Sequence, residues 1–493
     1  MFAGRPRGAA PDATADADGD PVGERSAAGS GVLVGYRKTL VGGTHQMEPL
    51  RVTPGVAVMV SGPTGSGKTT LLAQLIEDWP GPVMAISGKA DLMRLTRERR
   101  EARGTVWVVD PSGVTGSERD GIVLLEWCRT LRGAIEVAGA LTASAAQSGV
   151  TDSAFWFALA RRLIASSLFA AGVNGYTLSD VYRWVMTEEA FEVRGLLQAS
   201  GDETAMMMFE SVRLKDEKVL SSIYATAQQV VTVFDSPEAL ECMESPDIDI
   251  AVLAGTAAPK PALGQVLNEP GLGPWDLEET PGGAGPATLY ATLPVHMLDD
   301  FGPLVALMAR RLVKAAREHE AAGHELPAPV LLVVDEAATA ALLPLQEWTA
   351  TLRSSGVQVV STWQSVGQMD RQFGVSGSDV MLENSSVVLL GGARPTSSTR
   401  RVAAWLAGAD RSLMDPEGGA SEVRAGQPSG AAADPVEPEA RMGVEEAAFG
   451  LSRLPLGQAV VLDGPRLARV SVPGRDQVRA TQHATGGLDR AGS

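Results

Sequence analysis

Short runs of apolar, often β-branched residues alternate with stretches of helical periodicity along most of this chain. Leu71, Leu72 and Leu75, for example, follow the first such run at helical spacing. Apolar runs of this length, bounded by turn residues, are typical of buried strands. They occupy 56–60, 82–87, 105–110, 287–294, 330–334, 357–363 and 387–392. Apolar strands that alternate with helices predict a parallel sheet covered by helices on both faces, so the expected fold class is α/β.

The region from Gly121 to Ser245 has a different pattern, with long amphipathic stretches and few strand signals. This pattern predicts an all-α domain inserted after the strand that ends at Asp110. Within it, the stretch Ala154–Val173 is the most apolar of the chain, but Arg161 and Arg162 lie at its centre. Two central arginines would be costly in a bilayer, so we expect a buried helix and no transmembrane segment.

Composition and charge exclude several classes of protein. Of the 493 residues, 42 are Lys or Arg and 59 are Asp or Glu, which gives a net charge of −17 and excludes a uniformly basic nucleic-acid binder. A local basic surface, such as the lining of a pore, remains compatible with that charge. The two cysteines, Cys128 and Cys242, exclude a disulfide scaffold and a four-cysteine zinc site.

One basic run is interleaved with acidic residues, which favours a solvated helix face with ion pairs over a phosphate-binding surface. The run consists of Lys89, Arg94, Arg97, Arg99, Arg100 and Arg103.

The strongest motif lies between the first apolar run and the first helix. Residues 62–69 fit the phosphate-loop pattern G-x-x-x-x-G-K-[ST] at every fixed position. In such a loop, glycines let consecutive N–H groups face an anion, the lysine contacts the β- and γ-phosphates and the Thr hydroxyl binds Mg²⁺. These roles fall to Lys68 and Thr69, and the alternative is a chance match in a glycine-rich chain. The residues expected to bind the nucleotide are Gly62, Pro63, Thr64, Gly65, Ser66, Gly67, Lys68, Thr69 and Thr70.

Hydrolysis needs a carboxylate strand beside the phosphate loop, and the run at 330–334 leads directly into Asp335 and Glu336. We expect Asp335 to hold the Mg²⁺ shell and Glu336 to polarise the attacking water. The alternative is that the two acids cap the following helix.

Two further candidates follow in the sequence. Gln364 ends the strand at 357–363, where its amide would lie between the acids and the γ-phosphate, unless it is a solvent-exposed strand end. Arg353 lies 18 residues after Asp335. It is a candidate arginine finger for a neighbouring subunit's γ-phosphate, and the alternative is an ordinary surface arginine.

Three segments, in this order, carry a resemblance to a known family. They are GPTGSGKTT at Gly62–Thr70, the K-x-D-L to V-x-V-x-D-P stretch at Ile86–Gly113, and the D-E, R-x-x-G, Q-S and F-G series at Leu331–Gly374, with Asn384 beyond. The sequence resembles the conjugative coupling ATPases of type IV secretion, the VirD4/TraG/TraD group within the FtsK–HerA P-loop motors. It looks closest to the version encoded on actinobacterial mobile elements.

This resemblance implies a RecA-like P-loop domain with a mainly parallel sheet and an inserted all-α domain. It implies that Lys68 and Thr69 bind ATP with Mg²⁺ and that Asp335 and Glu336 are the acid pair. Arg353 matches the family's arginine finger, and Gln364 matches the family's glutamine at the end of the strand. The expected divisions are a disordered tail at 1–30, the nucleotide-binding domain at 31–120 and 287–473, the all-α domain at 121–250, a Pro/Gly-rich linker at 251–286 and a disordered tail at 474–493.

The implied function is an ATP-hydrolysing motor that delivers DNA or a DNA–protein substrate to a type IV secretion channel. The alternatives are a cytosolic FtsK/HerA-type DNA translocase and a nucleotide-switched adaptor that recruits cargo without sustained turnover. The implied partners are single-stranded DNA, a relaxase or other secreted cargo, channel components and further copies in a homo-hexamer. The expected location is cytoplasmic, or peripheral at the inner face of the cell membrane through partners.

Overall fold

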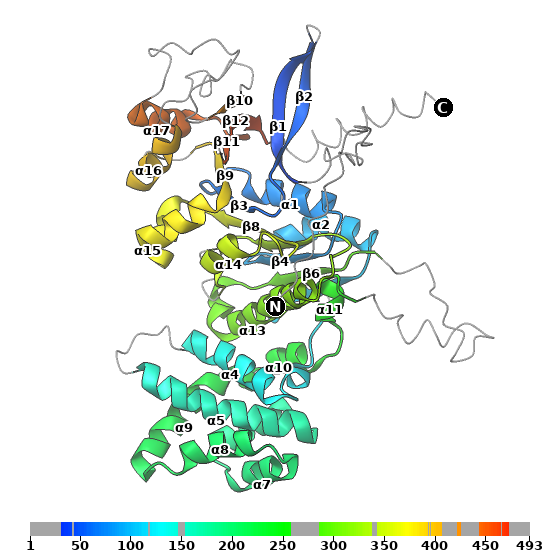
Figure 1. Ribbon diagram of the computed structural model, residues 1–493, viewed down its shortest axis with the longest axis vertical. Coiled ribbons are helices and arrows are strands. Elements are labelled where there is room, and N and C mark those ends of the chain that lie inside the picture. Colours follow the sequence, from blue (N-terminus) through cyan, green and yellow to red (C-terminus); the bar gives the residue numbers. More distant parts are fainter. Residues whose placement is uncertain are drawn as a thin grey trace, which may run out of the picture.

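The structure of the chain is a computed structural model (Figure 1). It describes residues 31–41, 44–116, 119–145, 153–257, 285–337, 343–392, 394, 396–406, 422–424, 443–464 and 466–472. The predicted tails and most of the predicted linker lie outside the described residues.

A single mixed sheet forms the centre of the molecule, in the order β2-β1-β12-β11-β9-β3-β8-β7-β4-β6-β5, with β10 beside β12. The strands are β1 (Val32–Val41), β2 (Thr44–Val52), β3 (Ala57–Ser61), β4 (Val83–Ser87), β5 (Val106–Val109), β6 (Thr288–Thr292), β7 (Val330–Val334), β8 (Val357–Trp363), β9 (Ser385–Leu390), β10 (Glu422–Arg424), β11 (Gln458–Asp463) and β12 (Arg466–Ser471).

The strands from β9 to β5 in this order are parallel. Every residue of β3, β4, β6, β7 and β8 is buried, because helices cover both faces of this part of the sheet.

The sheet continues beyond β9 with antiparallel strands, which the expected parallel sheet did not include. β11 and β12 form a hairpin at Asp463-Gly464, a dipeptide typical of hairpin turns, and β1 and β2 form a second hairpin beside it that projects from the molecule (Figure 1). The hairpin of β1 and β2 has weak strand signals because β2 contains Pro49 and several exposed polar residues.

Helices cover the sheet in two separate cores. On one face pack α1 (Lys68–Asp78) and α2 (Asp91–Glu101), whose buried residues include Leu71 and Leu92. On the other face pack α13 (Leu298–Ala321), α14 (Leu345–Thr351) and α15 (Val366–Glu383), and this second core continues into the helical region. The remaining elements of this part are η4 (Val295–Met297), α16 (Ser397–Leu406) and α17 (Val444–Arg453).

Helices make up most of the described residues between 121 and 257, with an isolated β-bridge between Val123 and Glu244, and they lie at the opposite end of the molecule from the antiparallel strands (Figure 1). The elements are α3 (Leu124–Trp127), α4 (Leu131–Ala145), α5 (Ser153–Asn174), α6 (Leu178–Met186), α7 (Phe191–Ser200), α8 (Glu203–Arg213), α9 (Glu217–Val231), η3 (Thr232–Asp235), α10 (Pro237–Glu244) and α11 (Ile250–Leu253). The two ends of this region lie side by side, since the N–H of Ile122 donates to Cys242 O and that of Ile248 donates to Gly121 O, both at 2.9 Å.

Helix α5 is the core of the helical region and packs against the helices from α4 to α9. Its segment Ala154–Asn174 is the one helix of the described residues that is long and apolar enough to cross a membrane. However, 61% of the apolar window is buried inside the protein, whereas Arg161 and Arg162 are exposed. The core helix of a folded domain has the same length and composition, and the burial of α5 fits that interpretation.

Candidate nucleotide-binding site

The phosphate loop connects β3 to α1, as the motif predicts. Gly65 and Gly67 have left-handed backbone conformations, with φ of 81° and 100°, which favour glycine. A Cβ at either position would meet no heavy atom within 4 Å, so backbone conformation and not crowding requires glycine there. Helix α1 begins at Lys68, and its N-terminus directs free N–H groups and a positive dipole end at the loop.

The side chain of Lys68 is buried in the loop and only 8% exposed. Its Nζ donates to the carbonyl oxygens of Gly62 at 2.6 Å and Pro63 at 3.0 Å. Burial lowers the pKa of this amine, Asp335 and Glu336 oppose that shift, and Lys89 adds to it. The hydroxyl of Ser66 is buried without a hydrogen-bond partner in the described residues. The glycine-rich loop, the Lys68 ammonium group and the buried Ser66 hydroxyl together fit the binding of a phosphate group.

The two predicted acids lie at the end of β7, on the same edge of the sheet as the loop. Asp335 is 7% exposed, and its carboxylate accepts hydrogen bonds from Ser87 Oγ at 3.1 Å and Thr362 Oγ1 at 2.8 Å. The same Thr362 oxygen accepts the backbone N–H of Glu336 at 2.9 Å. One threonine of β8 therefore positions both acids.

Glu336 has a backbone conformation that is unusual for its residue type. Its φ is 54°, and Glu188 is the other non-glycine residue with positive φ in the part of the chain that the structure describes. Such a conformation costs about 1–3 kcal/mol and occurs preferentially at functional sites. The side chain is 27% exposed, and its carboxylate lies 3.7 Å from Lys89 Nζ.

The structure places Gln364 with the loop and the acids. Gln364 follows β8, which lies between the loop strand β3 and the acid strand β7. Because these strands are parallel, their carboxyl ends share one edge of the sheet. Gln364 is exposed, and its N–H donates to Gln368 Oε1 at 2.9 Å.

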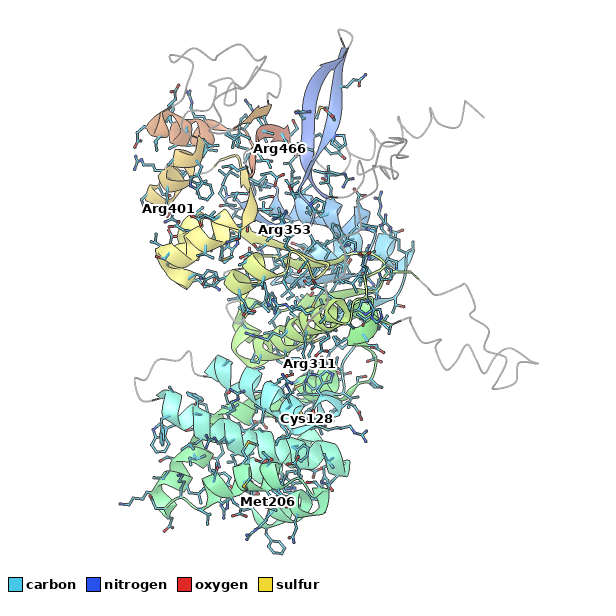
Figure 2. All side chains as sticks on the ribbon, viewed as in Figure 1. Cys128, Met206, Arg311, Arg353, Arg401 and Arg466 are labelled. Atoms are coloured by element: carbon cyan, nitrogen blue, oxygen red, sulfur yellow. The ribbon has the colours of Figure 1, made fainter. Side chains whose placement is uncertain are left out.

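Arg353 lies apart from the other candidates. It is an exposed residue in the turn between α14 and β8, and is labelled in Figure 2. A Cβ at Gly55, just before β3, would lie 2.7 Å from Arg353 O, which places the arginine at the amino edge of the sheet. The phosphate loop of the same chain lies at the opposite edge.

The sequence did not predict three residues that contact the acid pair. Ser87 and Thr362 bind the Asp335 carboxylate, and Lys89 faces Glu336. Their positions at the ends of strands could have indicated this role. Ser87 ends β4, Thr362 is the penultimate residue of β8 and Lys89 follows β4. Polar residues at the carboxyl ends of parallel strands lie together where such sheets bind ligands.

A family model described as "Type IV secretory system Conjugative DNA transfer" matches residues 30–255, and one described as "TraM recognition site of TraD and TraG" matches residues 329–424. The chain belongs to the coupling proteins of conjugative DNA transfer in type IV secretion. The family predicted from the sequence is thereby confirmed. These matches do not distinguish an actinobacterial mobile-element version, so that part stays a prediction.

Solved structures of coupling proteins have the same fold as this coupling protein. The bacterial conjugative coupling protein TrwBdeltaN70, in an unbound form, is 20% identical with a TM-score of 0.58, and the match covers 89% of this chain and 88% of that one. The plasmid coupling protein TrwB in complex with ADP and Mg²⁺ is 19% identical with a TM-score of 0.57, over 90% and 95% of the two chains. The predicted α/β class is confirmed. No curated protein matches the chain.

Proposed function

We propose that this coupling protein binds ATP with Mg²⁺ at the loop around Lys68 and hydrolyses it to drive DNA, or a DNA–protein complex, into the secretion channel. The observation that carries the proposal is the meeting of Lys68, Asp335 and Glu336 at one edge of the sheet, close enough for both acids to act on the lysine's pKa. The complex of TrwB with ADP and Mg²⁺ supports the choice of ligand for this fold.

The residues of the site have separate tasks in this proposal. The loop N–H groups, the Ser66 hydroxyl and Lys68 bind the phosphates, and Thr69 with Asp335 holds the metal. Bound Mg²⁺ would neutralise charge that develops on the phosphate oxygens. Glu336 orients and deprotonates the attacking water, and Gln364 lies at the strand end between the acids and the loop.

Steady-state hydrolysis and nucleotide binding, measured on the same variants, test the proposal. We expect Mg²⁺-dependent ATP hydrolysis by the wild-type chain and a fall of at least about 100-fold in Lys68→Ala, because the lysine stabilises transition-state charge. Glu336→Gln should abolish turnover but retain binding of a fluorescent ATP analogue. Lys215→Ala, an exposed lysine in the turn between α8 and α9, is the matched control.

Two outcomes would contradict the proposal. Wild-type turnover in Glu336→Gln would remove the assignment of the general base. A wild-type chain that binds ATP but does not hydrolyse it, with or without DNA, would favour the nucleotide-switched adaptor.

The proposal extends to partners and location. We expect active rings of six copies, single-stranded DNA with a relaxase as cargo, and channel components at the inner face of the membrane. The match of residues 329–424 to the TraM recognition model supports a docking surface for a relaxosome protein within that segment.

A further inference from the structure

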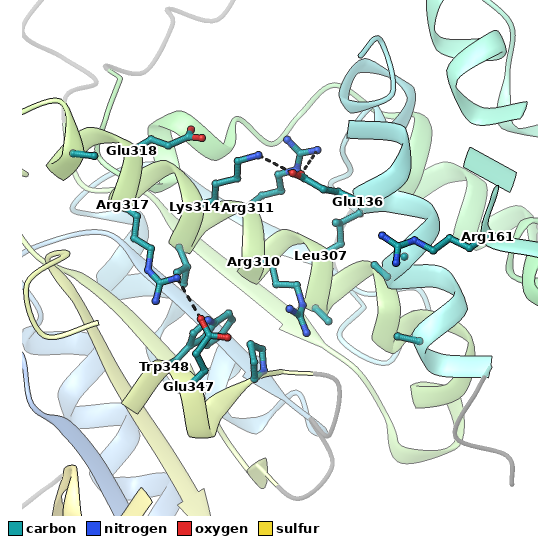
Figure 3. A pocket seen from close by; sticks show the side chains of 17 residues that line it. Glu136, Arg161, Leu307, Arg310, Arg311, Lys314, Arg317, Glu318, Glu347 and Trp348 are labelled. Carbon is teal, nitrogen blue, oxygen red and sulfur yellow. Dashed lines mark hydrogen bonds and ion pairs between the residues drawn. The ribbon is translucent and has the colours of Figure 1, made fainter. Parts of the chain in front are cut away.

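A cavity of about 650 Å³ lies between the helical region and helices α13 and α14, which cover one face of the sheet. Residues of α4 and α5 form one wall, and residues of α13 and α14 form the other (Figure 3). None of the phosphate-loop residues or predicted catalytic residues lines it. The cavity is therefore a separate candidate for ligand binding.

Cations line the cavity, although the chain as a whole is acidic. Arg310, Lys314 and Arg317 share one face of α13, since they are spaced by four and three residues. Arg311 lies beside them on α13, and Arg161 enters from α5 on the other wall (Figure 3). At 1.5 Å per residue, the positive face of α13 extends about 10 Å along the helix axis.

Acidic residues neutralise part of this charge. Glu136 of α4 lies 3.1 Å from Arg311 and 2.9 Å from Lys314, and Glu347 of α14 lies 3.4 Å from Arg317. The cavity residues comprise five cations and three acids, Glu318 being the third. The lining is thus net positive in a chain with a net charge of −17.

The local packing holds Arg161 at the cavity. The guanidinium of Arg161 lies against Gly139 of α4, where a Cβ would be 2.9 Å from Arg161 Cζ, and it donates to Ile135 O at 3.2 Å. Burial lowers the pKa of Arg310, and Glu347 opposes that shift. An arginine remains charged at neutral pH even so.

Between the cations, the lining is apolar. Its residues include Ala140, Ala143, Leu307, Pro344 and Trp348. A positively charged groove with apolar surface beside it is the combination that binds single-stranded nucleic acid without sequence preference, because the cations contact phosphates and the apolar surface contacts base faces.

We propose that this cavity binds the sugar–phosphate backbone of single-stranded DNA, an inference that rests on DNA being the cargo under the proposed function. Arginine guanidinium groups match phosphate oxygens with two parallel hydrogen bonds. The cations follow one another along α13, which suits successive phosphates of a linear polyanion. The site lies where the helical region meets the nucleotide-binding part, so bound DNA contacts both.

Binding of a fluorescent oligo-dT, measured by anisotropy without nucleotide and over a range of salt, tests the proposal. We expect Arg310→Gln and Arg161→Gln each to weaken binding by about tenfold and to reduce the salt dependence by about 0.7 per lost phosphate contact. Arg310→Lys retains the charge and should keep most of the salt dependence. Arg129→Gln, whose side chain is 62% exposed and ion-paired with Glu126, is the matched control outside the cavity.

DNA affinity is measured without ATP, so a failure of DNA binding can be distinguished from a failure of ATP hydrolysis. Equal affinities in the wild type, Arg310→Gln and Arg161→Gln would overturn the proposal, as would a wild type that does not bind oligo-dT.

Polyglutamate and inorganic phosphate serve as competitors. If polyglutamate binds more tightly than oligo-dT, and only its binding falls in Arg310→Gln, the cavity takes an acidic protein and the proposal is wrong. Thermal melting checks each variant's fold, and Arg161→Gln tests the cavity from a second element.

Discussion

At the residue scale, the site depends on a threonine that lies outside the phosphate-loop motif. Thr362 is fully buried, donates to Asp335 and accepts from the N–H of Glu336. It therefore fixes the orientation of the carboxylate proposed to hold the metal and the strained backbone of the proposed base. Residues that orient metal-binding carboxylates in this way act on metal affinity without contacting the substrate.

We expect Thr362→Val to lower ATP turnover by about 10- to 100-fold and to raise the Mg²⁺ concentration needed for half-maximal activity. The substitution keeps the shape of the side chain but removes the hydrogen bonds of Thr362 to the Glu336 N–H and to one Asp335 oxygen, which also destabilises the fold by about 1–3 kcal/mol. Titration of ATPase activity with Mg²⁺ measures the effect, with Thr226→Val as control, because the Thr226 hydroxyl on α9 donates only to Ser222 O within its own helix. An unchanged Mg²⁺ dependence would show that the threonine is only structural.

At the element scale, α2 differs from the solvated helix that its sequence predicts. Arg97 pairs with Glu101 and Arg99 with Glu77, as expected for such a helix. Arg100, however, is fully buried, and its pKa falls to about 10, mainly through burial. It donates to Trp79 O at 2.7 Å, Gly81 O at 2.9 Å and Thr288 Oγ1 at 2.8 Å. The carbonyls after α1 need donors that the helix cannot supply, which explains the buried arginine.

Arg100→Met should therefore destabilise the protein by about 2–5 kcal/mol, since several buried carbonyls lose their donor. Arg97→Met, which breaks an exposed ion pair on the same helix, should cost less than about 1 kcal/mol. Urea unfolding followed by circular dichroism compares the two variants. Equal destabilisation would mean that the buried hydrogen bonds of Arg100 contribute no more than a surface pair.

At the scale of the whole molecule, the distance between Arg353 and the phosphate loop decides how the arginine can act. The two lie at opposite edges of the sheet, so Arg353 is remote from the site of its own chain. An arginine at the amino edge reaches a nucleotide only if a second copy presents its loop to that edge. A head-to-tail ring gives every copy this arrangement.

Mixing Arg353→Ala with Lys68→Ala subunits should therefore restore part of the ATPase activity that each variant lacks alone. With random mixing at equal amounts, about a quarter of the interfaces combine an intact loop with an intact arginine. The control is a mixture of Lys68→Ala with Glu336→Gln, which should show no rescue because both residues serve the same chain's site. Absence of rescue at every mixing ratio would count against the finger role.

Local chemistry made much of the fold and the loop predictable from the sequence. The phosphate loop depends on glycines with positive φ and on the adjacent helix start, and the buried strands depend on unbroken apolar runs. The structure agrees with the sequence at β8, for which the expected and observed bounds are both Val357–Trp363. The hairpin of β1 and β2 was missed because its polar, proline-containing strand gains stability from pairing and not from its own composition.

The sequence by itself determined the phosphate loop, the apolar strands and the acid pair, because each is encoded by residues adjacent in the chain. Only the tertiary structure decided which residues from distant parts of the chain contact one another. Ser87 reaches Asp335 across 248 positions, and Glu136 reaches the cations of α13 from the helical region. It also separated Arg353 from the site and placed Arg100 in the core. Such contacts join segments whose spacing in the chain carries no signal, and only the packing of the whole sheet and its helices brings them together.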